Sequence, residues 1–107
     1  MEFRLFIGCV QGASLVRKAY FLDDVKDKTE AIGAAEEKAR DKGKNGATAG
    51  LYAREGSTKC YAIRGWKVLG EGKLTDIPSW EVEQILQVYP ADFDIPPLGK
   101  EDLEHLR

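Results

Sequence analysis

The sequence contains few of the residues on which metal binding, disulfide bonding and histidine-based catalysis depend. Its 107 residues include one histidine, two cysteines and one asparagine. These numbers exclude most cysteine–histidine metal frameworks and disulfide-based scaffolds. No run of about 18 apolar residues is present, which excludes a transmembrane helix, and the N-terminus lacks the basic region and the cleavage site of a signal peptide. We therefore expect a cytoplasmic protein that is not associated with a membrane.

Motifs for catalysis are missing as well. A catalytic histidine needs an orienting partner and a positioned nucleophile, so His105, close to the C-terminus, is predicted to be a surface residue. The segment from Gly65 to Gly70 matches the first half of a phosphate-binding loop, but Glu71 and Gly72 follow where a lysine and a serine or threonine are required. Neighbouring carboxylates at 23–24, 36–37 and 92–94 are expected to be solvated charges. The sequence thus predicts no catalytic residue, no metal site and no cofactor, and we expect a protein that is not an enzyme.

The composition that is present is typical of one globular domain. Apolar residues make up 43% and charged residues 32% of the chain, and a chain of this length can bury about 60–70% of its unfolded surface. We therefore treat 1–107 as a single domain. Alternation of apolar residues predicts strands over 3–10 and 15–22, joined by a turn at 11–14. Both faces of the first strand are apolar, so we expect it to be central or covered on both sides.

A helix is predicted to begin after Asp27 and to end near Lys42. Asp27 and Glu30 fit a capping box, in which the Asp27 carboxylate accepts a hydrogen bond from the Glu30 amide, and Gly43 follows at the expected C′ position. Except for Ile32, the apolar residues of this segment are alanines. Because so small a face lets a helix lie close to a sheet, large side chains of the sheet must fill the space between the two layers.

The second half of the chain is richer in turns, with Asn45 and Gly46 as the clearest turn signal. Strands are predicted over 49–54 and 58–69, with a bulge or a bend at Gly65. A helix capped by Ser79 follows, since four apolar residues then have helical spacing: Val82, Ile85, Leu86 and Tyr89. Residues 91–107 are predicted to be an extended tail with a closing helical turn near its end. Its apolar residues either cover the sheet or order on a partner: Phe93, Ile95 and Leu98.

The element order is therefore ββαββ(β)α plus the tail, which we assign to the α+β class. We expect an antiparallel sheet of four to five strands with two helices, since short turns join the strands. Five large aliphatic residues are predicted to share one core between the layers: Ile7, Ile32, Ile63, Ile85 and Leu86. Cys9 and Cys60 alternate with apolar residues in predicted strands, so we expect packed thiols and no disulfide.

Charge is distributed unevenly along the chain. Residues 1–73 hold 14 basic and 10 acidic residues, a net +4, whereas 74–107 hold two basic and eight acidic residues, a net −6. Within the first part, 38–73 carry nine basic and three acidic residues, a net +6. Such asymmetry has two interpretations. Either a basic surface faces an anionic partner, or the two segments fold against each other and their charges largely cancel.

The basic segment also supplies the candidate binding residues, which lie on or beside one predicted hairpin: Arg54, Lys59, Arg64, Trp66 and Lys67. By alternation, Tyr52 and Arg54 share a face, as do Arg64 and Trp66. Tryptophan, tyrosine and arginine are enriched at the energetic centres of protein interfaces, and aromatic and basic residues also bind single-stranded nucleic acid. A third interpretation places Trp66 and one tyrosine in the core. The sequence pI of about 5.4 argues against a dedicated nucleic-acid binder.

From these features we expect a small non-enzymatic binding protein that occludes a surface of a macromolecular partner, as inhibitors, adaptors and immunity-type proteins do. A protein partner is favoured, and no small-molecule ligand is indicated. The alternative is a nucleic-acid-binding module that uses the basic, aromatic-containing segment 38–73.

Overall fold

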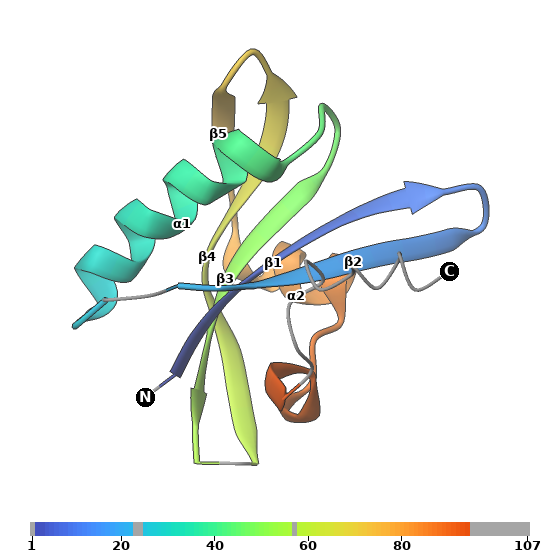
Figure 1. Cartoon of the computed structure of the whole chain (residues 1–107). Helices are drawn as coiled ribbons and strands as arrows, with labels where there is room; N and C mark the ends of the chain where they lie inside the picture. Colours follow the sequence, from blue (N-terminus) through green and yellow to red (C-terminus); the bar gives the residue numbers. More distant parts are fainter. Residues whose placement is uncertain (1, 23–24, 57, 95–107) are drawn as a thin grey trace, which may run out of the picture.

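A five-stranded antiparallel sheet forms the centre of the molecule. The computed structural model describes residues 2–22, 25–56 and 58–94. The strands lie in the order β2-β1-β3-β4-β5, with these bounds: β1 (Glu2–Gln11), β2 (Ser14–Phe21), β3 (Thr48–Glu55), β4 (Lys59–Gly70) and β5 (Lys73–Ile77). The chain between β2 and β3 forms α1 (Lys28–Lys42), and β5 is followed by α2 (Ser79–Leu86) and by a short 3-10 helix, η1 (Pro90–Asp94) (Figure 1). The predicted α+β class is confirmed, and the fifth strand is 73–77.

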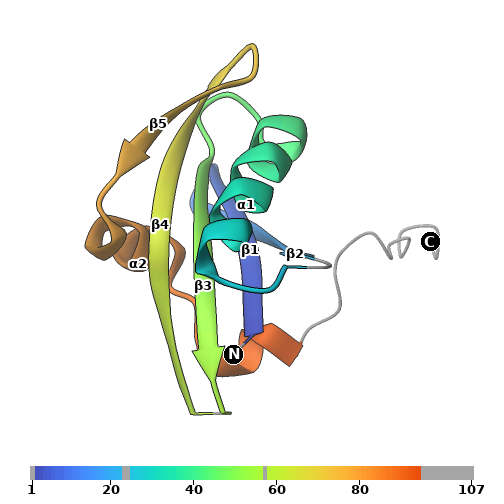
Figure 2. The ribbon, with the colours of Figure 1, turned by 90° about the vertical axis from the view of Figure 1, so that its left-hand side faces the viewer.

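The two helices lie on opposite faces of the sheet (Figure 2). The interior strand β1 contributes to both layers, because Leu5 and Ile7 pack on the α1 side and Phe6 packs on the α2 side. The prediction of one shared core is wrong for this reason. Ile7, Ile32 and Ile63 belong to the α1 side and Ile85 and Leu86 to the α2 side, and Ile32, Ile63 and Ile85 are only partly buried. A sheet covered on both faces necessarily has two cores.

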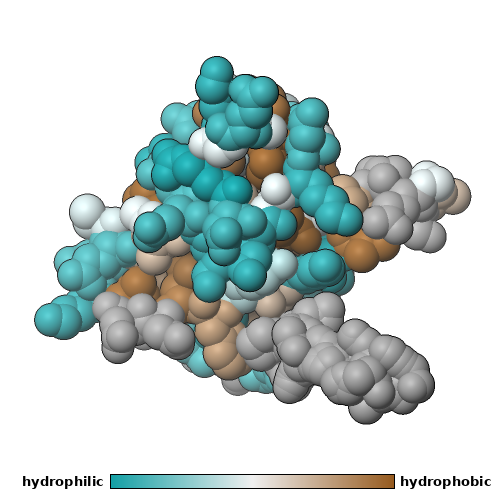
Figure 3. Space-filling view, turned by 45° about the horizontal axis from the view of Figure 1, so that its top comes forward, coloured by the Kyte–Doolittle hydropathy of each residue, from teal (hydrophilic) through white to brown (hydrophobic). Residues whose placement is uncertain are grey.

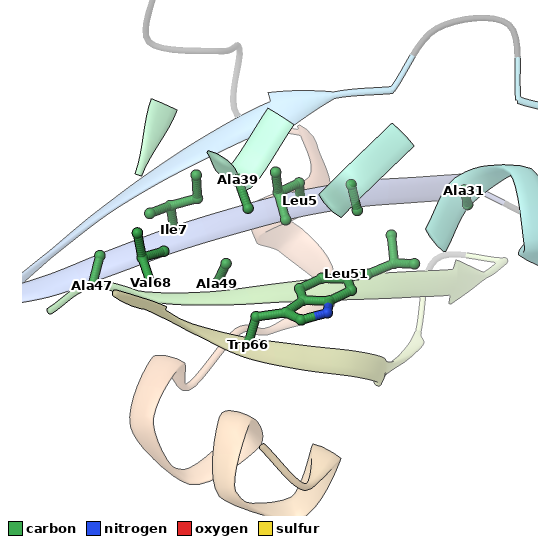
Figure 4. Packing of buried hydrophobic residues seen from close by; sticks show 10 residues of the cluster. Leu5, Ile7, Ala31, Ala39, Ala47, Ala49, Leu51, Trp66 and Val68 are labelled. Carbon is green, nitrogen blue, oxygen red and sulfur yellow. The ribbon is translucent and has the colours of Figure 1, made fainter. Parts of the chain in front are cut away.

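On the α1 side, the helix contributes small side chains to the core and the sheet contributes large ones. Ala31, Ala35 and Ala39 are fully buried. They pack against large side chains of β1, β3 and β4, among them Leu5, Leu51 and Trp66 (Figure 4). The expectation that large residues of the sheet fill this layer is confirmed.

Local signals fix the start of α1, while packing explains its end. The Asp27 carboxylate accepts a hydrogen bond from the Glu30 amide (2.9 Å), as predicted, and Glu30 Oε1 accepts one from the Lys26 amide (2.7 Å). Gly43 follows the helix, but its φ is −79° and thus not left-handed. A methyl group there would lie 2.8 Å from Val68 Cγ2 and 2.7 Å from the Ala39 carbonyl oxygen. Glycine is therefore required by close packing against β4.

On the α2 side the arrangement is reversed: the sheet contributes glycines and the helix contributes the larger side chains. Gly50 of β3 and Gly65 of β4 are direct partners across the sheet, and Val82 of α2 sits on both. A methyl group at Gly50 would lie 2.5 Å from Val82 Cγ1, and one at Gly65 would overlap Val82 Cγ2. The two glycines thus leave space on the sheet directly under α2, and the side chains of Val82 and Leu86 fill this space.

A β-bulge separates the two halves of β4. Leu51 pairs with Arg64 but the next residue, Tyr52, pairs with Ala62, so Ile63 has no partner on β3. The predicted irregularity thus lies two residues before Gly65, and β4 remains one strand. Because a bulge inserts one extra residue, the alternation of side chains changes phase at Ile63.

The C-terminal elements differ from the sequence prediction. Pro78, and not Ser79, is the N-cap of α2, and no side chain caps the helix start. The helix ends at Leu86 because Gln87 adopts a left-handed conformation (φ 52°), so Tyr89 lies outside it and is 65% exposed. Residues 90–94 form η1, where an extended tail was predicted, and Phe93 is buried against Phe6, as expected of a residue that covers the sheet. Ile95, Leu98, His105 and the predicted terminal helical turn lie outside the described residues.

Candidate binding surfaces

The five candidate residues of the basic segment do not form one surface. Arg54 points to the α2 side with Tyr52, whereas Arg64 and Trp66 point to the α1 side, because the bulge at Ile63 reverses the phase of β4. Simple alternation along two strands cannot detect such a reversal. The five residues therefore do not share one face of the hairpin, and their role in partner binding stays a prediction.

Trp66 is a core residue. It is 1% exposed and packs between β3 and α1, with Leu51 as a neighbour (Figure 4). Among the described residues, its Nε1 has no hydrogen-bond partner. The guanidinium of Arg64 lies 5.7 Å from the indole ring and also forms ion pairs with Asp76 (3.2 Å) and Glu36 (3.9 Å). Arg64 thus covers the edge of this core and is half-exposed.

Arg54 is occupied by the protein's own acidic segment. It is 8% exposed, and its Nη2 lies 2.6 Å from Glu2 Oε1 and 3.1 Å from Asp94 Oδ1. Its Nη1 donates a hydrogen bond to the Pro90 carbonyl (2.9 Å). The hydrogen bonds to Asp94 and Glu2 raise the pKa of Arg54. Of the five candidates, Lys59 is exposed and Lys67 is half-buried on the α2 side.

Two further arginines, which the sequence analysis did not select, hold the same segment. Arg17 Nη1 donates hydrogen bonds to the carbonyls of Leu86 and Gln87 (both 2.9 Å) and lies 3.4 Å from Asp92 Oδ2. It thereby satisfies carbonyls at the end of α2, where a cation is also favoured by the helix dipole. Arg4 Nη2 donates to the Phe93 carbonyl (3.2 Å). The signal available in the sequence was a cation within each of the first two strands.

These contacts support the second interpretation of the charge asymmetry. Arg17 pairs with Asp92, Arg54 with Asp94, and Arg64 with Asp76, so basic residues before position 73 meet acidic residues after it. Three arginines of β1, β2 and β3 thus hold α2 and η1 on the sheet, and we call them the arginine fasteners: Arg4, Arg17 and Arg54. They are not a basic surface offered to a partner.

An exposed stripe on α2 is the clearest surface that sequence reasoning missed. Trp80 is 62% exposed, and exposed residues follow it at helical spacing: Glu83, Gln84 and Gln87. Tyr89, just beyond the helix, is 65% exposed. We call these five residues the α2 surface. For Trp80 and Gln84 the pattern was available in the sequence, because these positions lie opposite Val82 and Leu86 on a helix. Tyr89 was predicted on the apolar face and is exposed because the helix ends at Leu86.

The α2 surface adjoins a strand edge. β5 pairs with β4 only from Gly65 to Gly70. Among the described residues, no strand therefore pairs with the first half of β4 on that side. Glu83 Oε2 accepts a hydrogen bond from the Ala62 amide (3.0 Å) and so occupies a donor of this open edge. Covering edge donors in this way opposes edge-to-edge association.

Comparison of the chain with protein-family models, with curated proteins and with solved structures found no match. Within the part of the chain that the structure describes, no group of three or more His, Cys, Asp or Glu side chains could hold a metal ion. None of the helices described is long and apolar enough to cross a membrane. Any assignment of function must therefore come from the surface chemistry of this molecule.

Proposed function

We propose that the protein is a non-enzymatic binding protein that uses the α2 surface to occlude a surface of a protein partner. The observation that carries the proposal is the exposure of Trp80 and Tyr89 at the two ends of α2. Tryptophan and tyrosine dominate the energetic centres of protein interfaces, where neighbouring contacts exclude water. The glycines beneath Val82 and the arginine fasteners fix α2 on the sheet, so binding would require little ordering of this helix.

The charge of this region favours a basic partner. Residues 74–94 contain five acidic residues and no lysine, arginine or histidine. Three of these carboxylates pair with arginines of the sheet, while Glu81 and Glu83 form no ion pair among the described residues. Complementary charge around an aromatic centre would speed association and select against acidic proteins. An inhibitor, adaptor or immunity-type protein acting in the cytoplasm fits this description.

Two groups on the α2 side of the sheet, the buried Tyr52 and the partly buried Cys60, have raised pKa values. Burial, with Asp92 and Glu83 nearby, raises the pKa of the Cys60 thiol, which disfavours the reactive thiolate. Burial also raises the pKa of Tyr52, whose hydroxyl donates to the Val82 carbonyl (3.4 Å). Both groups are held in their neutral forms, which suits packing.

The alternative, nucleic-acid binding through 38–73, loses two of its main residues. Arg54 and Trp66 are buried, so Arg40, Arg64 and the lysines of this segment remain for phosphate contacts. Nucleic-acid binding through these cations would weaken steeply with salt because counterions are released. Binding by the α2 surface would depend on Trp80 instead. Substitution of Trp80 and a change in salt concentration therefore distinguish the two proposals.

A crosslinking experiment tests the proposal. A photoreactive amino acid is placed at position 84 on the α2 surface and, as control, at the exposed position 37 on α1, and nuclease-treated host lysate is irradiated. We expect a basic protein to be captured from position 84 and not from position 37.

The captured protein is then purified and titrated against defined variants. In a Trp66→Phe background, Trp80 is the only tryptophan, and its emission should shift to shorter wavelength when a partner covers it. Trp80→Ala should raise the Kd by about 30-fold or more, whereas Glu37→Ala should leave it unchanged. Equal binding of the Trp80→Ala variant would overturn the proposal.

A further inference from the structure

The β1–β2 hairpin and the turn before β3 part to form an open fork, and the residues that line it differ from those of the α2 surface. β1 pairs with β3 only as far as Gly8 opposite Thr48, although β1 continues beside β2 to Gln11. Beyond Gly8 the β1–β2 hairpin diverges from the turn that precedes β3 (Figure 1). Two hollows open at this fork, and Gly8, Cys9 and Lys44 line both. One is on the α1 side, beside Ile7, and the other is on the α2 side, beside Ile85.

The charge at the fork is of one sign. Of the residues that the structure describes, no acidic one lines either hollow. Four lysines do: Lys18, Lys42, Lys44 and Lys67. Lys42 forms an exposed ion pair with Asp41 (3.7 Å), whereas the other three form no ion pair within residues 2–22, 25–56 and 58–94. Figure 3, in which this end of the molecule comes forward, shows hydrophilic side chains around recessed hydrophobic ones. Converging cations in a concave position attract an anion.

The turn that carries Lys44 is firmly held. The Ala47 amide donates to the Lys44 carbonyl (2.9 Å), and Gly46 has a φ of 94°, as the predicted turn requires. The Gly46 amide donates to the Val68 carbonyl (2.8 Å), and the Val68 amide donates to the Ala47 carbonyl (2.9 Å). The turn is thus fixed to β4 next to Lys67, which pairs with Thr48 across the sheet. The backbone positions of both lysines are therefore set before any ligand arrives.

We propose that the hollow on the α2 side binds a small organic phosphate. Its volume is about 500 Å³, within the range of small-molecule sites. Lys44 and Lys67 would neutralise a phosphate monoester, which carries close to two negative charges at neutral pH, while Asn45 and Thr48 offer polar groups. Ile85 and Gly8 provide an apolar wall and open space for the organic part. A nucleic acid is a weaker fit, since stacking drives single-strand binding and, within the described part of the chain, Tyr20 is the only aromatic residue that lines either hollow.

Titration followed by amide NMR tests this proposal on the full chain. The probes are phenyl phosphate and inorganic phosphate, added at constant ionic strength so that screening does not change. We expect saturable shifts centred on Gly8, Gly46, Thr48 and Lys67, with phenyl phosphate binding more tightly than inorganic phosphate. Lys67→Gln and Lys44→Gln should each raise the Kd by about tenfold, since each removes a charge-assisted hydrogen bond.

The matched control is Lys59→Gln, which removes the same charge from the exposed beginning of β4. It should leave the Kd unchanged, and all three variants should keep the melting temperature of the parent. Equal weakening by Lys59→Gln, or linear shifts without saturation, would overturn the proposal. Tighter binding of a single-stranded oligonucleotide than of phenyl phosphate, with shifts spreading over 38–73, would also overturn it and assign the fork to nucleic acid. None of these outcomes depends on Trp80, so the proposal fails or stands separately from the function proposed for the α2 surface.

Discussion

The two faces of the sheet solve the same packing problem with opposite residues. On the α1 side, alanines of the helix meet Leu5, Leu51 and Trp66 of the sheet. On the α2 side, Val82 and Leu86 of the helix meet Gly50 and Gly65 of the sheet. A helix can approach a sheet closely only where one of the two packed faces carries small side chains, and either the helix or the sheet can supply them.

The two layers also differ in what fastens them besides apolar contact. The α2 layer is tied down by charged hydrogen bonds from Arg4, Arg17 and Arg54 to backbone carbonyls of 86–93. No comparable set joins the described residues of α1 to the sheet, where Arg64 with Glu36 is the one ion pair. The short α2, with eight residues, needs this support because so few turns are marginal by themselves.

Loss of the largest core side chain should have the largest effect on stability. Trp66→Ala removes a fully buried indole from the α1 side and should lower the free energy of unfolding by about 3–5 kcal/mol in urea denaturation. Trp80→Ala is the matched control, because Trp80 is mostly exposed, and should change it by about 0.5 kcal/mol or less. Equal losses for the two variants would show that Trp66 is not the centre of this core.

Adding a methyl group to a glycine should have opposite effects on stability on the two sides of the sheet. Gly65→Ala would overlap Val82 and should cost about 1–3 kcal/mol through overpacking, part of which Val82→Ala in the same chain should restore. Gly33→Ala on α1 meets no atom within 4 Å and should stabilise the protein by about 0.5–1 kcal/mol through helix propensity. Thermal unfolding of the three variants checks these signs, and a stabilising Gly65→Ala would contradict the close approach of α2.

Removal of one fastener should loosen only the α2 layer. Arg17→Met keeps the aliphatic stem but leaves the Leu86 and Gln87 carbonyls without their donor, at a cost of about 1–2 kcal/mol. Amide hydrogen exchange should become faster in α2 and remain unchanged in α1. Lys18→Met, on the neighbouring exposed position of β2, is the control, and uniform acceleration in both helices would contradict the assignment.

The smallest expected effect is an alkaline loss of stability that depends on Tyr52. Because burial raises the pKa of Tyr52 in the folded protein, its neutral form stabilises the fold fully below the ordinary tyrosine pKa of about 10, and this contribution is lost as pH rises further. Tyr52→Phe should therefore show a shallower decline, by at most about 1.4 kcal/mol per pH unit. Unfolding free energies measured on both sides of this pKa check the difference, and identical slopes for the two proteins would contradict it.

Several features of this protein are determined by neighbouring residues in the sequence. Asp27 and Glu30 fix the start of α1, the alanines fix how closely that helix packs, and Asn45-Gly46 fixes the turn before β3. The apolar residues on both sides of β1 predicted a central strand. Such features are predictable because capping, periodicity and turn geometry depend on residues a few positions apart.

Other features were decided only by the tertiary structure. The bulge at Ile63 set the opposite orientations of Arg54 and Trp66, and only cross-strand pairing reveals it. Gly43, Gly50 and Gly65 are needed because side chains distant in the sequence approach them, and Tyr89 joins the α2 surface only because the helix ends at Leu86. The sequence around Arg17 is compatible with a surface cation. Its role follows from the carbonyls at the end of α2, which lie about seventy positions later in the chain and accept its hydrogen bonds. Register and close approach depend on contacts between distant parts of the chain, and local periodicity carries no information about them.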